Sequence, residues 1–164
     1  MNRLSELFEH HHEALYRYLV RLSGDADVAA DAAQEAFVRL LERPSMGTVE
    51  RAWLFRVGTN YVFELRRTSA RRTRLLWGRG ERTMADAPRD PHAHVEADER
   101  KRVVIAALSR LSDKERIAIL MREEGFSHRE IAEAVGTTTG SVGTLLARTL
   151  ERLARETTVD REAL

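Results

Sequence analysis

The fold is decided by residues 111–156, which read LSDKERIAILMREEGFSHREIAEAVGTTTGSVGTLLARTLERLARE. Ser112 and Glu115 stand three positions apart, as do Ser127 and Glu130, and at this spacing a hydroxyl and a carboxylate together cap the start of a helix. The apolar run after each pair ends at a glycine, which can take the left-handed conformation of a helix C-terminus. The pattern predicts two short helices and a longer third one, the order found in a helix-turn-helix.

The third helix of this stretch begins at one of three threonines, 137–139, and carries apolar residues at spacings of three and four from Val142 to Leu153. In a helix-turn-helix it enters the major groove of DNA. Base recognition commonly uses Arg, Asn or Gln, and none lies between Thr137 and Ala147, so we expect weak, shape-led recognition. The expected contacts are Thr138, Thr139, Ser141 and Thr144, with Arg129 and Arg148 on phosphates. A plain helical hairpin is the alternative.

Composition limits the classes of protein to consider. A chain of 164 residues, 43% apolar and 32% charged, forms one ordinary soluble domain or two small ones. The absence of cysteine excludes disulfides, thiol catalysis and cysteine-based zinc sites. No apolar run approaches the roughly 20 residues that span a bilayer, and the N-terminus lacks the basic flank of a signal peptide. We therefore expect a cytoplasmic protein with no membrane insertion.

The sequence contains no motif that predicts catalysis. There is no glycine-rich phosphate loop, nucleophile elbow or paired-carboxylate motif, so we expect neither an enzyme nor a cofactor. His10, His11 and His12 are adjacent and point in three directions around a helix, so they cannot converge on one metal. We expect no metal site.

Three helices are predicted in the N-terminal part. Apolar spacing marks a helix over Leu4–Leu22 and a second one that is capped by Asp25 or Asp27 and stops before Pro44. A third helix carries Trp53 on its apolar side and ends in arginines. The three apolar faces can bury one core and form a bundle of about 70 residues.

The arginines at the end of this third helix form a strongly basic run, because no carboxylate falls between Arg66 and Gly80. The run consists of Arg66, Arg67, Arg71, Arg72, Arg74 and Arg79. Such a surface favours phosphates. An ordinary solvated charge run is the alternative.

Charge and periodicity together divide the chain. Residues 81–99 hold two basic and six acidic residues, and helical periodicity disappears in the same region. No strand pattern appears. We therefore predict an all-α protein in which an N-terminal bundle of three to four helices, residues 1–72, is joined by a flexible acidic linker, 73–98, to a helix-turn-helix domain, 99–164.

This order of parts resembles the extracytoplasmic-function sigma factors of bacterial RNA polymerase. The resemblance rests on the Asp-Ala-Ala-Gln-Glu-Ala-Phe segment 31–37, on Arg-Ala-Trp-Leu at 51–54 continuing to Arg66-Arg67, on the acidic linker and on the helix-turn-helix. It implies a sigma-2-like domain that binds core polymerase and melts the minus-10 element. It also implies a sigma-4-like domain that recognises the minus-35 element, and hence a protein that directs promoter-specific transcription initiation.

The resemblance also implies roles for particular residues. Asp31, Gln34 and Glu35 would dock on the clamp helices of polymerase. The minus-10 contacts would be Ser45, Met46, Thr48, Arg51, Trp53, Arg56, Asn60, Arg66, Arg67, Arg71 and Arg72. Trp53 is alternatively a core residue, and Asn60 a polar helix position without a role. Along the recognition helix the chain departs from the family, because Gly143, Leu145 and Ala147 stand where basic residues and a histidine are usual.

The partners implied are core RNA polymerase, through its clamp helices and flap, promoter DNA and an anti-sigma factor. The linker would thread the nucleic-acid channel of polymerase, or else serve as a solvated spacer. Two other functions stay open. One is a free-standing DNA-binding regulator, and the other is a sigma mimic that occupies an anti-sigma protein and binds no DNA.

Overall fold

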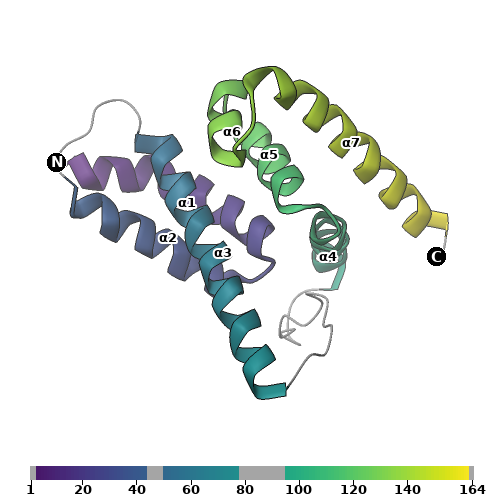
Figure 1. Cartoon of the computed structure of the whole chain (residues 1–164), viewed down its shortest axis with the longest axis horizontal. Coiled ribbons are helices and arrows are strands. Elements are labelled where there is room, and N and C mark those ends of the chain that lie inside the picture. Colours follow the sequence, from purple (N-terminus) through teal and green to yellow (C-terminus); the bar gives the residue numbers. More distant parts are fainter. Residues whose placement is uncertain (1–2, 44–49, 78–94, 163–164) are drawn as a thin grey trace. The chain divides into compact units, whose positions relative to one another are not determined.

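The computed structural model describes residues 3–43, 50–77 and 95–162. Within these residues the chain forms seven helices and no strand, so the predicted all-α class is confirmed (Figure 1). The chain separates into two compact units, Met1–Ala87 and Pro88–Leu164.

Unit 1 is a bundle of α1 (Arg3–Ser23), α2 (Ala26–Leu41) and α3 (Glu50–Trp77), in which each helix packs against the other two (Figure 1). The side chain of Asp25 caps α2 by accepting hydrogen bonds from the backbone N–H groups of Asp27 and Val28. The sequence left Asp25 and Asp27 as alternatives, and the structure selects Asp25.

Small residues allow the three helices of unit 1 to pack closely. The buried face of α2 contains Ala29, Ala32, Ala33 and Ala36, all fully buried. On α3, a Cβ placed on Gly58 would lie 3.1 Å from both side-chain methyl carbons of Leu19 on α1. Gly58 is therefore closely packed, because an added methyl group would require the Leu19 side chain to shift by a few tenths of an ångström.

A polar pair lies inside the core of unit 1. The hydroxyl oxygens of Tyr18 and Thr59 are 2.8 Å apart, and Thr59 Oγ1 donates to the carbonyl of Phe55 at 2.7 Å. Because the Thr59 proton is used in that bond, Tyr18 is the donor to Thr59. Burial raises the pKa of Tyr18, so its donating, neutral form is kept.

Unit 2 consists of α4 (Val95–Ser109), α5 (Asp113–Glu123), α6 (His128–Val135) and α7 (Thr139–Glu162). Both predicted capping boxes are present. Ser112 N–H donates to Glu115 Oε2 at 2.8 Å, and Ser127 N–H donates to Glu130 Oε2 at 2.8 Å. Gly136 follows α6 with φ 71°, the left-handed conformation predicted for the turn. The helix-turn-helix is thus α6, this turn and α7.

The core of unit 2 is mainly aliphatic. Its buried residues include Leu108, Leu111, Ile117, Leu120, Met121, Phe126, Ile131, Val142 and Leu146. They come from all four helices, so the unit encloses one apolar core.

A buried arginine joins two helices of unit 2. Arg116 on α5 is only 6% exposed. Its guanidinium donates to the carbonyl oxygens of Leu108 at 2.8 Å, Ser109 at 3.1 Å and Leu111 at 3.1 Å. The last carbonyls of a helix have no partner within the helix, so Arg116 satisfies the end of α4 and positions α5 against it. Burial lowers the pKa of Arg116, partly opposed by the nearby charge of Asp113.

Unit 1 contains a related contact. Arg66 on α3 donates to the carbonyl oxygens of Leu22 at 2.8 Å and Ser23 at 3.4 Å, at the end of α1. Its guanidinium carbon also lies 5.3 Å from the centroid of the Phe63 ring. Arg66 is half-buried, so this contact is more open to solvent than that of Arg116.

Candidate functional site

The outer face of α3 gathers several of the expected minus-10 residues. Arg56, Asn60, Arg67 and Arg71 are exposed and recur at intervals of four, seven and four residues. At 3.6 residues per turn they share one side of the helix and extend over about 22 Å at 1.5 Å per residue. Within the part of the chain that the structure describes, Arg56, Arg67 and Arg71 form no ion pair. Their charges are therefore open to an external anion.

Two of the expected arginines do not belong to this face. Arg72 is exposed but lies about 100° around the helix from Arg71. Arg66 points toward α1 and is engaged by the carbonyls of Leu22 and Ser23. The sequence gives the phase of each arginine around the helix, but not this use of Arg66 within the fold.

Trp53, near the start of α3, is partly exposed and is covered on one face by a cation. The guanidinium carbon of Arg43 lies 4.6 Å from the centroid of the Trp53 ring. Leu54 and Phe55 beside it are fully buried, and the Arg51 guanidinium carbon lies 5.6 Å from the Phe55 ring centroid. Trp53 is thus neither a fully buried core residue nor a bare platform. Sequence analysis did not identify Arg43.

Ser45, Met46 and Thr48, the expected base pocket, lie outside the described residues.

The outward face of α2 carries the expected polymerase contacts and two apolar residues. Asp31 and Gln34 are exposed, and Val38 and Leu41 are 41% and 61% exposed on the same side of the helix. Glu35 accepts a hydrogen bond from Arg39 Nε at 2.7 Å, which offsets its charge. The face is therefore less acidic and more apolar than the sequence analysis expected. A count of helical spacing from Asp31 would have identified Val38.

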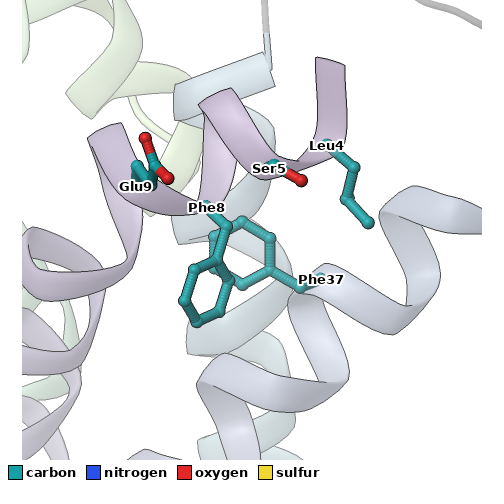
Figure 2. A pocket seen from close by; sticks show the side chains of 5 residues that line it. All are labelled: Leu4, Ser5, Phe8, Glu9 and Phe37. Carbon is teal, nitrogen blue, oxygen red and sulfur yellow. The ribbon is translucent and has the colours of Figure 1, made fainter. Parts of the chain in front are cut away.

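A small apolar pocket lies between α1 and α2. Leu4, Ser5, Phe8, Glu9 and Phe37 line it, and Figure 2 shows the two phenylalanine rings side by side. Their ring centroids are 5.0 Å apart. Phe37 is 7% exposed and Phe8 46%, so Phe37 belongs to the core and Phe8 forms its edge.

The three adjacent histidines are engaged within unit 1. The His12 ring stacks on Phe8 with centroids 4.3 Å apart, and His10 Nδ1 lies 2.9 Å from the carbonyl oxygen of Glu6. In residues 3–43, 50–77 and 95–162, no group of three or more His, Asp or Glu side chains is arranged to hold a metal ion. Over the same residues, no helix has the length and hydrophobicity needed to cross a membrane.

In unit 2, four of the expected minus-35 residues lie at or directly before the start of α7, while Arg129 lies on α6 and Arg148 further along α7. Thr138, Thr139, Ser141 and Thr144 are all exposed, and the hydroxyl oxygens of Thr138 and Ser141 are 2.7 Å apart. Ser141, Thr144 and Arg148 follow at intervals of three and four, so they share one side of α7. This side presents two hydroxyls and one guanidinium.

Four arginines of unit 2 are paired with glutamates. Arg129 Nε lies 3.4 Å from Glu133, within α6. The remaining pairs are Arg110 with Glu156, Arg152 with Glu115 and Glu156, and Arg155 with Glu151. Arg152 also donates to the carbonyl of Arg110 at 2.7 Å. This network therefore joins α7 to the C-terminal end of α4 and to the first turn of α5.

Two exposed glycines lie in the first turns of α7. A Cβ on Gly140 would have no atom within 4 Å, and one on Gly143 would lie 3.9 Å from His128 Cε1, an ordinary contact. Neither glycine has a positive φ. Glycine inside a helix costs about 1 kcal/mol relative to alanine. Neither packing nor backbone conformation within unit 2 explains that cost.

Both units match known protein families. The family described as Sigma-70 region 2 matches residues 7–72, and that described as Sigma-70, region 4 matches residues 101–153. The first match includes α2 and the arginine face of α3, and the second includes the helix-turn-helix.

Two similar proteins are both named as ECF RNA polymerase sigma factors, and the similarity extends over most of their length. The chain is 32% identical over 142 residues to the ECF RNA polymerase sigma factor SigL of Mycobacterium tuberculosis, covering 83% of this chain and 78% of SigL. It is 30% identical over 151 residues to the ECF RNA polymerase sigma factor EcfG of Rhodopseudomonas palustris, covering 90% of this chain and 81% of EcfG.

Two solved structures share the fold. The sigma factor RpoE in complex with the anti-sigma factor NepR, from Bartonella quintana, has a TM-score of 0.73 at 24% identity and covers 95% of this chain and 97% of RpoE. CnrH in complex with the cytosolic domain of CnrY has a TM-score of 0.67 at 22% identity, covering 96% of this chain and 88% of CnrH.

Proposed function

The chain belongs to the extracytoplasmic-function RNA polymerase sigma factors, and on this premise we propose how its two units divide the work of promoter recognition. Proteins of this family bind core RNA polymerase and promoter DNA and direct transcription initiation. Residues 1–72 bind core polymerase and melt the minus-10 element, residues 73–98 connect the units, and residues 99–164 bind the minus-35 element. The observation that carries this division is the match to regions 2 and 4 in chain order.

Polymerase docking uses the outward face of α2, against the clamp helices. Asp31 and Gln34 provide an acid and an amide, and Val38 adds apolar area on the same side. Burial of an exposed apolar side chain supplies affinity, while polar groups fix the orientation. Glu35 contributes less charge than Asp31, because Arg39 already pairs with it. The flap of polymerase is the second contact, made by residues 99–164.

Promoter melting uses α3. A single strand needs a basic path for its phosphates and aromatic or planar surfaces for its bases. Arg56, Asn60, Arg67 and Arg71 form the path, and Arg72 reaches phosphates from the adjacent side. Trp53 and Arg51 lie at the start of the helix. Arg66 is left out of this set because it is engaged at the end of α1. By family resemblance, Ser45, Met46 and Thr48 receive an unpaired base.

Recognition of the minus-35 element uses the start of α7 in the major groove. The hydroxyls of Thr138, Thr139, Ser141 and Thr144 face outward, and Arg148 lies one turn beyond Thr144. Arg129 contacts a phosphate from α6 after leaving its exposed pair with Glu133, which is a weak interaction at the surface.

The protein acts in the cytoplasm, where polymerase is, and an anti-sigma factor binds it, as NepR binds RpoE in the complex that shares its fold. The arginine face of α3 argues against a mimic that binds no DNA. The match to region 2 argues against a free-standing regulator, because this region serves polymerase.

Run-off transcription tests the proposed function. The purified chain is combined with sigma-free core polymerase on fragmented genomic DNA, and the RNA 5′ ends are mapped. We expect new transcripts whose starts share two upstream elements. A variant with Thr139→Ala, Ser141→Ala and Thr144→Ala should change or abolish promoter choice while still binding core polymerase.

The possible outcomes separate the functions. If the chain does not bind core polymerase, it is either a sigma mimic or a free-standing DNA-binding regulator. An unchanged promoter set with the triple variant would show that the start of α7 does not recognise the upstream element.

A further inference from the structure

The structure explains why glycine occupies some positions of the chain but not others. Gly58 packs closely against Leu19, and Gly136 takes the left-handed conformation of its turn. Gly140 and Gly143 have neither reason, since a methyl group fits at both positions and their φ values are not positive. The cost of Gly143 in the interior of α7 therefore has no explanation within unit 2, and Gly140, the second residue of the helix, has no packing requirement for glycine either.

The side chains beside these glycines give an explanation. The exposed residues available for base recognition, Ser141 and Thr144, are short, and no Arg, Asn or Gln lies between Thr137 and Ala147. A hydroxyl near the backbone contacts a base edge only if the helix lies deep in the groove. A helix that recognises bases through Arg or Gln can lie further out.

The position of the glycines around α7 fits this requirement. At about 100° per residue, Gly140 lies about 40° from Thr144 and Gly143 about 100° from it, toward α6. His128, the first residue of α6, borders Gly143 at the distance of an ordinary contact from an added Cβ. The exposed surface beside the hydroxyls is therefore bare backbone, bordered by an imidazole.

We infer that Gly140 and Gly143 are specificity-determining residues, because bare backbone at these positions lets double-stranded promoter DNA approach α7 closely enough for Ser141 and Thr144 to contact base edges. This inference rests on the proposed function and adds to it the way in which a helix without long polar side chains recognises DNA. A side chain at either glycine meets the wall of the groove before the hydroxyls reach the bases.

The test uses Gly140→Ala and Gly143→Ala, singly and together, in the full-length chain. Because alanine is the better helix former, amide hydrogen exchange across α7 should become slower and the melting temperature of unit 2 should rise by about 4 °C per substitution. Core polymerase binding should not change. Run-off transcription from the wild-type promoters should fall at least 10-fold for the double variant.

A matched control is Glu151→Ala, an alanine substitution at an exposed position later in α7. It should leave transcription unchanged. The inference is overturned if the double variant gains helix stability and transcribes the same promoters at the wild-type level. It is also overturned if the variant loses stability, since the glycines would then serve the fold. If the wild-type chain binds core polymerase but yields no transcripts, the proposed function fails before the glycines are compared.

Discussion

The exposed arginines of α3 in unit 1 differ from a group of arginines in unit 2 in how their charges are paired. In unit 1, Arg56, Arg67 and Arg71 lie exposed along α3 without an ion pair among the described residues. In unit 2, four arginines pair with glutamates, as Arg152 does with Glu115 at 3.2 Å. Unpaired cations attract any phosphate, whereas paired cations have part of their charge already neutralised. We therefore expect the proposed DNA binding of unit 1 to depend mainly on charge and that of unit 2 mainly on close fit.

The units also differ in how deeply they bury the arginine that donates hydrogen bonds to the last carbonyls of a helix. Arg116 is inside the core of unit 2 and bonds to three carbonyls, whereas Arg66 is half-buried and bonds to two. A buried carbonyl that loses its donor cannot turn to water, but one near the surface can. The same kind of contact should therefore matter more in unit 2.

The largest expected effect is on stability. Arg116→Met should lower the free energy of unfolding of unit 2 by about 3 kcal/mol, because two buried carbonyls and one part-buried carbonyl lose a charged donor. Arg66→Met should cost unit 1 only about 1 kcal/mol. Urea unfolding followed by hydrogen exchange measures unit 2. Tryptophan fluorescence measures unit 1, since both tryptophans, Trp53 and Trp77, belong to it. Equal losses would show that burial does not distinguish the two contacts.

The next effect concerns DNA binding by the holoenzyme. Arg71→Ala removes an open cation and should weaken promoter binding several-fold at moderate salt. It should also make the dependence of log affinity on log salt shallower by about 0.7 to 0.9. Arg155→Ala is the matched control, because this exposed arginine of unit 2 pairs with Glu151 at 3.4 Å. Salt titration of promoter binding compares the two, and identical slopes would remove the distinction between open and paired arginines.

The smallest effect is a dependence of unit 2 on pH. Burial works to raise the pKa of Glu115, but hydrogen bonds from Ser112 and the charge and hydrogen bond of Arg152 outweigh it and hold the pKa below the ordinary value of 4.5. A lowered folded-state pKa stabilises the fold above the unfolded-state value, and this contribution is lost as pH falls through the folded-state pKa.

Glu115→Gln keeps an acceptor for Ser112 N–H but removes the charge facing Arg152. It should cost about 0.5 kcal/mol at pH 7, and the cost should shrink as pH falls through the lowered pKa of the wild-type carboxyl. Chemical unfolding of unit 2 over a series of pH values from 7 downward measures this difference. A cost that persists in acid would assign the role of Glu115 to hydrogen bonding alone.

Local signals in the sequence were sufficient for much of unit 2. Ser112, Ser127 and Gly136 act on residues within one helical turn, so their spacing alone predicted the caps and the turn that the structure contains. The all-α class follows from the same kind of pattern.

Contacts between distant residues were not predictable in this way. Arg66 bonds to Leu22, 44 positions earlier, and no local pattern distinguishes Arg66 from Arg67 in the arginine run. The bond between Tyr18 and Thr59 likewise joins positions 41 residues apart. The fold selects which polar residues are used inside the protein, and only the remainder is available for binding.

The contact between Arg43 and Trp53 makes the intrinsic fluorescence of Trp53 a probe of the local structure. Indole emission depends on nearby charge, and the Arg43 guanidinium lies 4.6 Å from the ring centroid, joining the residues that follow α2 to the start of α3. With Trp77 replaced by phenylalanine, the remaining tryptophan signal comes from this pair alone. Separation of the two side chains during promoter opening would then appear as a change in colour and intensity, in real time and without an added dye.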